Sequence, residues 1–138
     1  MVQNVHEAGA AALNRGDIPA FVRLYHPDAV VHDPQYSEPL VGRERIEQDI
    51  VALVRAVPDL RIMIRTVLQH AADSASQYTI SGTQTGPLIG PEGEIPPSGE
   101  AIESNASVFS RLDQDGLVVE EHRYYDILTL FPQVGAVA

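Results

Sequence analysis

The sequence predicts an α+β fold, with helices first and a run of antiparallel strands after them. Three observations lead to this prediction. The chain has 138 residues, the size of one domain with its own core, and we treat 1–138 as a single domain. Apolar residues recur at helical spacing up to residue 57 and alternate as in strands from residue 61. Burying the helix stripes requires a sheet that curls over them and encloses a cavity.

Two helices are expected at the start of the chain. Residues 2–14 are rich in alanine, and Gly16 stands where a helix commonly ends. Asp17 is a natural N-cap for a second helix, which tolerates Pro19 in its first turn. Apolar residues then follow at helical spacing up to Tyr25, so the second helix is expected to reach that residue.

A third helix is expected to begin near Arg43 and to end before Pro58. Its apolar stripe contains Ile46, Ile50, Leu53, Val54 and Val57, and its water-facing side contains Glu44, Glu47 and Asp49.

Strands are expected at residues 29–32, 61–70, 77–85, 100–112 and 117–126. Residues 126–131 are expected to prolong the last of them past a kink. Residues 86–99 are dense in glycine and proline, which predicts an irregular rim or lid loop.

Composition excludes several kinds of chemistry. The chain has no cysteine, hence no thiol nucleophile and no thiolate metal site. All nine basic residues are arginine, which excludes a Schiff-base lysine. A formal charge of −10 argues against nucleic acid as a partner. No segment is long and apolar enough to cross a membrane, and the first residues do not resemble a signal peptide, so we expect a cytoplasmic location.

The last long strand carries the most chemistry. Side chains alternate between the two faces of a strand. One face is expected to present Val118, Glu120, His122, Tyr124 and Asp126, and the other Leu117, Val119, Glu121, Arg123 and Tyr125. The first row combines an imidazole, a phenol and a carboxylate, so we expect it to line the pocket, with Asp126 as the proton-transfer residue. Val119 and Tyr125 would then lie on the outer face, where a homodimer could form.

Six short motifs, in order, resemble the SnoaL-like polyketide cyclases. They are His-Pro-Asp-Ala-Val-Val-His-Asp-Pro at 26–34, Gly42 before a helix, Val-Pro-Asp-Leu at 57–60, Gly-Thr-Gln-Thr-Gly at 82–86, Ile-Pro-Pro-Ser-Gly at 95–99, and Arg-Tyr-Tyr-Asp at 123–126. The resemblance implies a cone-shaped α+β barrel, shared with nuclear transport factor 2 and ketosteroid isomerase, and a homodimer. It also implies that Asp126 matches the acid/base aspartate of the family.

Asp33 is a second candidate for the base. The pair Asp33–Pro34 resembles the ketosteroid isomerases, whose general base is the aspartate of such a pair. The two oxyanion donors of those enzymes correspond here to Gly9 and Ser107, which cannot replace them. Steroid isomerisation is therefore disfavoured.

The remaining candidates are polar residues near these two acids. His122 could orient Asp126 or donate a proton to a developing alkoxide. Five further side chains are candidates for binding substrate: His32, Tyr36, Gln84, Asn105 and Tyr124. The family often has histidine at the position of Gln84. His26, His32 and Asp33 do not have the spacing of a known metal motif, so no metal is expected.

These residues favour an enzyme that needs no cofactor and acts on a hydrophobic, carbonyl-rich small molecule. Asp126 would remove an acidic proton, and the carbanion would close a ring by intramolecular aldol addition. One alternative is a non-catalytic module that binds a small molecule in the same cavity. Another is epoxide hydrolysis, for which Arg65 or Arg123 would have to join an aspartate around a water molecule.

Overall fold

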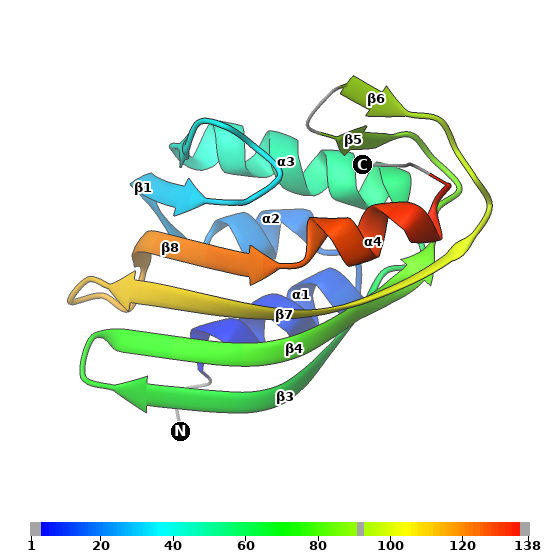
Figure 1. Ribbon diagram of the computed structural model, residues 1–138. Helices are drawn as coiled ribbons and strands as arrows, with labels where there is room; N and C mark the ends of the chain where they lie inside the picture. Colours follow the sequence, from blue (N-terminus) through cyan, green and yellow to red (C-terminus); the bar gives the residue numbers. More distant parts are fainter. Residues whose placement is uncertain (1–3, 91–92, 136–138) are drawn as a thin grey trace.

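The computed structural model describes residues 4–90 and 93–135. In chain order its elements are α1 (Val5–Asn14), α2 (Ile18–Val22), β1 (Tyr25–His32), β2 (Leu40–Val41), α3 (Arg43–Ala56), β3 (Arg61–His70), β4 (Asp73–Thr83), β5 (Leu88–Gly90), β6 (Gly93–Ile95), β7 (Ala101–Leu112), β8 (Val118–Tyr125) and α4 (Ile127–Gln133). Strands β3, β4 and β7 bend along their length, and α1 to α3 lie on one side of the sheet (Figure 1). The predicted α+β class with a curved sheet is confirmed.

The sheet is mixed, whereas the sequence led us to expect an antiparallel one. Its strand order is β2-β1-β8-β7-β4-β3. All neighbouring strands run antiparallel except β1 and β8, which are parallel. In that pair Val31 lies opposite Glu121, and His32 lies opposite His122. An early strand and the last strand therefore lie side by side, and their polar residues meet.

Side-chain caps fix the two N-terminal helices. The Asn4 side chain accepts a hydrogen bond from the backbone N–H of His6 at 2.8 Å, and Asp17 accepts one from Ala20 at 3.0 Å, as expected of N-caps. The second helix is shorter than expected, because it ends at Val22 and β1 already begins at Tyr25.

The segment predicted to be irregular contains two short antiparallel strands, β5 and β6. Gln84 anchors this region. Its side chain is fully buried, donates to the carbonyls of Gly86 and Pro96 at 3.0 Å each, and accepts from the N–H of Ser98 at 3.1 Å. Gln84 is thus a structural residue, and the expectation that it binds substrate is wrong.

The end of the chain also differs from the prediction, since residues 127–133 form helix α4 instead of prolonging β8. Asp126 immediately precedes this helix. Its carboxylate accepts from the N–H and the hydroxyl of Thr129 at 3.3 and 2.6 Å, the pattern of a helix N-cap. The local capping interaction ends the strand there.

Two groups of buried apolar side chains form the core, one around Ala56, Val57 and Ile102 and the other around Tyr25, Val31 and Ile46. Within residues 4–90 and 93–135, the helices are too short or too polar to span a membrane.

Candidate active site

A β-bulge in β8 decides which of its side chains reach the interior. Arg111 of β7 pairs with Glu120, but the next residue, Leu112, pairs with Val118, so Val119 is an extra residue. A shift of one residue exchanges the two faces of a strand. Beyond the bulge, Glu121, Arg123 and Tyr125 line the interior cavity, together with Val118.

The predicted pocket row of β8 is therefore wrong. His122 and Tyr124 do not line the interior cavity, and Tyr124 is 55% exposed. Tyr125, which we expected on the outer face, lines the cavity instead. Tyr125 therefore does not support the expected homodimer contact on the outer face.

The interior cavity has a volume of about 170 Å³ and lies between the helices and the concave face of the sheet. Most of its lining is apolar, including Leu13, Leu53, Val57, Ile62, Ile80 and Leu88. Its charged lining consists of Asp33, which follows β1, Asp49 of α3, and Glu121 and Arg123 of β8. A cavity of this kind suits a hydrophobic small molecule with a few polar groups.

Arg123 is the centre of the polar lining. Its Nε donates to Glu121 Oε2 at 2.9 Å, and its Nη1 donates to Asp33 Oδ2 at 3.1 Å and to Asp49 Oδ2 at 2.8 Å. The four side chains are between 4% and 10% exposed. Burial alone would lower the pKa of Arg123, but its phenol and carboxylate neighbours raise that pKa well above its ordinary value. The guanidinium is thus a permanent cation among three acids.

Each of the three carboxylates also accepts a hydrogen bond from a tyrosine. Tyr125 donates to Asp33 Oδ1 at 2.5 Å, Tyr36 to Asp49 Oδ1 at 2.8 Å, and Tyr25 to Glu121 Oε2 at 2.8 Å. Burial, followed by the neighbouring carboxylate, raises the pKa of each of these phenols. The phenols therefore stay protonated at neutral pH and act as donors.

His6 of α1 also lines the cavity, and its Nε2 lies 3.4 Å from the carbonyl oxygen of Ser74. Burial lowers the pKa of His6, and Glu121 offsets part of this effect. The neutral imidazole is thus the favoured form.

Of the eight residues predicted for the site, only Asp33 lines the interior cavity. Asp126 is exposed and caps α4, so the expectation that it lies in a water-free hollow is wrong. Asn105 is exposed and accepts from the hydroxyl of Thr79 at 2.9 Å, so it does not contact the cavity either.

Four other predicted residues line a second, more open groove of about 280 Å³: His32, Tyr36, His122 and Tyr124. Asp33 and Arg123 line both hollows. The Asp33–Arg123 ion pair therefore separates the interior cavity from this outer groove.

The prediction considered Arg123 only for epoxide hydrolysis, and it missed several other residues of the site: Asp49, Glu121, Tyr25, Tyr125 and His6. Asp49 was expected to face water, yet it is only 6% exposed. It stands three residues after Ile46 and four before Leu53, which places it on the apolar stripe of α3. This spacing indicated that Asp49 is buried.

Comparisons with known proteins agree with this architecture. A family model described as SnoaL-like polyketide cyclase matches residues 3–134. TsrD from Streptomyces laurentii is 26% identical, with a TM-score of 0.80, over 96% of this chain and 93% of that one. IdmH from Streptomyces antibioticus, a proposed polyketide cyclase, is 25% identical, with a TM-score of 0.76, over 96% of both chains. AclR from Streptomyces galilaeus, a proposed hydroxylase, is 22% identical, with a TM-score of 0.79, over 95% of this chain and 78% of that one, and shows the fold alone. The comparison with curated proteins found no match.

Proposed function

The chain belongs to the SnoaL-like polyketide cyclase family, and on that premise we propose that it closes a ring in a hydrophobic, carbonyl-rich small molecule without a cofactor. The observation that carries this proposal is the position of Asp33. Its carboxylate lies in the wall of an apolar cavity and is oriented by Arg123 and Tyr125. Asp33 thus replaces Asp126 as the proposed base.

In the proposed reaction, Asp33 takes a proton from a substrate carbon that lies between two carbonyl groups. The resulting carbanion attacks a second carbonyl carbon of the same molecule, and the new alkoxide recovers the proton from Asp33. No electrons are gained or lost overall, so the reaction needs no redox partner. The apolar walls hold the flexible substrate in a reactive conformer, which supplies much of the rate.

Tyr125 and Arg123 have supporting roles. The phenol of Tyr125 can turn its hydrogen bond from Asp33 to the enolate oxygen, and such a donor contributes about 3 kcal/mol to stabilising the transition state. Arg123 remains charged, because its carboxylate and phenol neighbours raise its pKa. It holds Asp33 in place and offsets the negative charge that develops on the substrate.

The test uses open-chain 1,3-dicarbonyl esters that carry an aryl group, and liquid chromatography follows their ring closure. Asp33→Asn keeps the shape of the side chain without the base, and we expect at least about a 100-fold loss of rate. Asp126→Asn should retain the rate, since Asp126 is exposed and caps a helix. An Asp33→Asn protein that cyclises as fast as wild type would refute the assignment. If a bound ligand is recovered unchanged, the non-catalytic alternative is favoured.

One contact favours a second candidate function, the opening of an epoxide. A single guanidinium nitrogen, Arg123 Nη1, bridges Asp33 and Asp49 at 3.1 and 2.8 Å. In this reaction one aspartate acts as a carboxylate and accepts a proton from the attacking oxygen, while the other enters as the carboxylic acid and protonates the epoxide oxygen. Transfer of a proton from the first aspartate to the second then restores both groups. A solved protein described as the epoxide hydrolase/cyclase-like enzyme SalBIII shares the fold, at 16% identity and a TM-score of 0.73, over 89% of this chain and 88% of that one.

Asp49→Asn separates the two candidates. Epoxide opening needs both acids, so the rate at which this variant opens an aryl epoxide should fall at least about 100-fold. Aldol closure needs Asp33 alone as base and should be affected much less.

A further inference from the structure

The outer face of the β1–β8 pair carries two histidines and a glutamate that the proposed reaction does not use. His32 and His122 are direct neighbours across the parallel pair. Their rings stack with centroids 4.4 Å apart and an interplanar angle of 10°. Glu120 stands two residues before His122 and therefore projects from the same face of β8.

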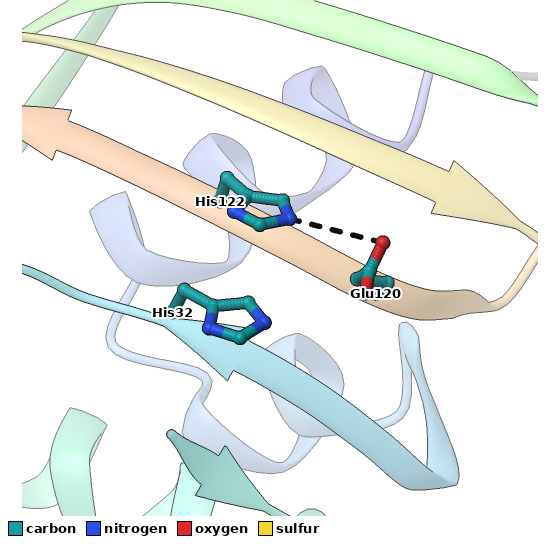
Figure 2. Close-up of side chains that lie close together, drawn as sticks. All are labelled: His32, Glu120 and His122. Atoms are coloured by element: carbon teal, nitrogen blue, oxygen red, sulfur yellow. Dashed lines mark ion pairs between the residues drawn. The ribbon is translucent and has the colours of Figure 1, made fainter. Parts of the chain in front are cut away.

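Figure 2 shows how the three side chains converge. A ring nitrogen of each imidazole points toward the side on which Glu120 lies, and Nε2 of His122 is 3.7 Å from Glu120 Oε1. One ligand atom from each residue lies within 4.8 Å of the other two. We propose that His32, Glu120 and His122 bind a divalent transition-metal ion, with Zn²⁺ as the best fit.

The distances are close to those that zinc requires. With Zn–N and Zn–O distances near 2.1 Å, two ligand atoms of a tetrahedral site are about 3.4 Å apart. The present separations must therefore shorten by at most about 1.4 Å, a change on the scale of side-chain rotations. The two rings must tilt out of their parallel stack, because a metal ion lies in the plane of each imidazole that binds it.

The surroundings of Glu120 are compatible with this role. Its neighbour across the sheet is Arg111, a potential competitor for the carboxylate. The guanidinium of Arg111 instead forms an ion pair with Asp73, at 3.7 Å. The side chains of His122 and Glu120 are 41% and 46% exposed, so an ion can reach them from solvent.

Two imidazoles and one carboxylate also define which metals fit. Nitrogen donors favour Zn²⁺, Ni²⁺, Cu²⁺ and Co²⁺, whereas Mg²⁺ and Ca²⁺ prefer sites made of oxygen atoms. His32 forms no metal motif with residues close to it along the chain, so no local pattern marks this site. The true partners lie about 90 residues further on and come close only through the parallel pairing.

The position of the ion suggests what it does. His32 and His122 are followed immediately by Asp33 and Arg123, whose side chains form the ion pair on the inner face. An ion held by both histidines would fasten β1 to β8 directly behind that pair. We expect bound zinc to stabilise the folded protein, since it binds no preformed site in the unfolded chain.

The test uses untagged protein freed of metal with a chelator and titrated with zinc chloride in a calorimeter. We expect one ion per chain with a Kd of about 10 μM or tighter. His32→Gln and His122→Gln should each weaken binding at least about tenfold, and Glu120→Gln should weaken it less. His70→Gln, an exposed histidine at the end of β3, is the matched control and should bind like wild type.

Two further measurements on the wild-type chain do not depend on the variants folding. One equivalent of zinc should raise Tm, whereas magnesium should not. Cobalt chloride should give the strong visible absorption of a four- or five-coordinate ion with nitrogen ligands. A weak spectrum like that of hexaaqua cobalt, or a zinc Kd above about 1 mM, would overturn the proposal. Unchanged zinc binding by a folded His32→Gln/His122→Gln protein would overturn it as well.

Discussion

Replacing Arg123 by methionine tests whether the buried ion cluster is as tightly coupled as its geometry indicates. Arg123 is the shared cation of Asp33, Asp49 and Glu121, with contacts of 3.1, 2.8 and 2.9 Å. Removing one partner of a buried ion pair typically costs 3–5 kcal/mol, because the other charge is left uncompensated. Here three carboxylates lose the same partner, so we expect a loss of at least about 4 kcal/mol in the free energy of unfolding. That is a large part of the 5–15 kcal/mol of an ordinary domain.

Urea unfolding followed by circular dichroism measures this change, since the chain has no tryptophan for fluorescence. Arg111→Met is the matched control. It removes the ion pair with Asp73, whose two side chains are 65% and 72% exposed, and should cost less than about 1 kcal/mol. Adding Glu121→Gln to Arg123→Met should recover part of the loss, because one unpaired charge disappears. If Arg123→Met were as stable as the Arg111→Met control, the cluster would not be a coupled unit.

Three further predictions concern pH and packing. Burial lowers the pKa of His6, so the unfolded chain binds its proton more readily and stability should fall as the pH drops below about 6.5. His6→Gln should lose less stability between pH 7 and 5 in urea titrations, and parallel curves for the two proteins would refute this. Burial raises the pKa of Tyr78 to about 12, so its contribution should be complete below about pH 10 and lost as the pH rises toward 12. Alkaline unfolding followed by circular dichroism should start at higher pH in Tyr78→Phe, and an equal onset would contradict the prediction. A Cβ at Gly86 would collide with the backbone carbonyl of Arg55, so Gly86→Ala should lower stability by about 1–3 kcal/mol, and a wild-type Tm would show that the close approach is absent.

Features of the fold that depend on residues close to one another along the chain could be predicted from the sequence. Asp17 caps α2 as expected, and Gly42 directly precedes α3. The alternation of residues 61–70 marks β3 at the predicted bounds. The parallel pairing of β1 with β8 could not be predicted in this way, because it joins residues that are 90 positions apart and have no local signature.

The candidate site was only partly predictable for the same reason. Asp33 was recognised from the residues next to it, and it lines the cavity. Arg123 was assigned to the wrong face, because the row with an imidazole, a phenol and a carboxylate was chosen to line the pocket. The bulge at Val119 places the apolar Val118 on the face of Glu121 and Arg123 instead. That bulge arises from pairing with β7, so the residues of β8 alone do not reveal it. Asp49 was within reach of prediction, since its place on the apolar stripe of α3 already indicated burial.

The β1–β8 pair links the buried ion cluster with the proposed metal site. Along each strand, consecutive residues project to opposite faces, so His32 and His122 lie outside while Asp33 and Arg123 lie inside. The imidazole stack and the ion pair each span the same two strands, one on each face of the sheet. A change in the spacing of β1 and β8 therefore alters the outer imidazoles and the inner ion pair at once. Because Asp33 depends on Arg123 for its position, the separation of these two strands controls the geometry of the proposed base.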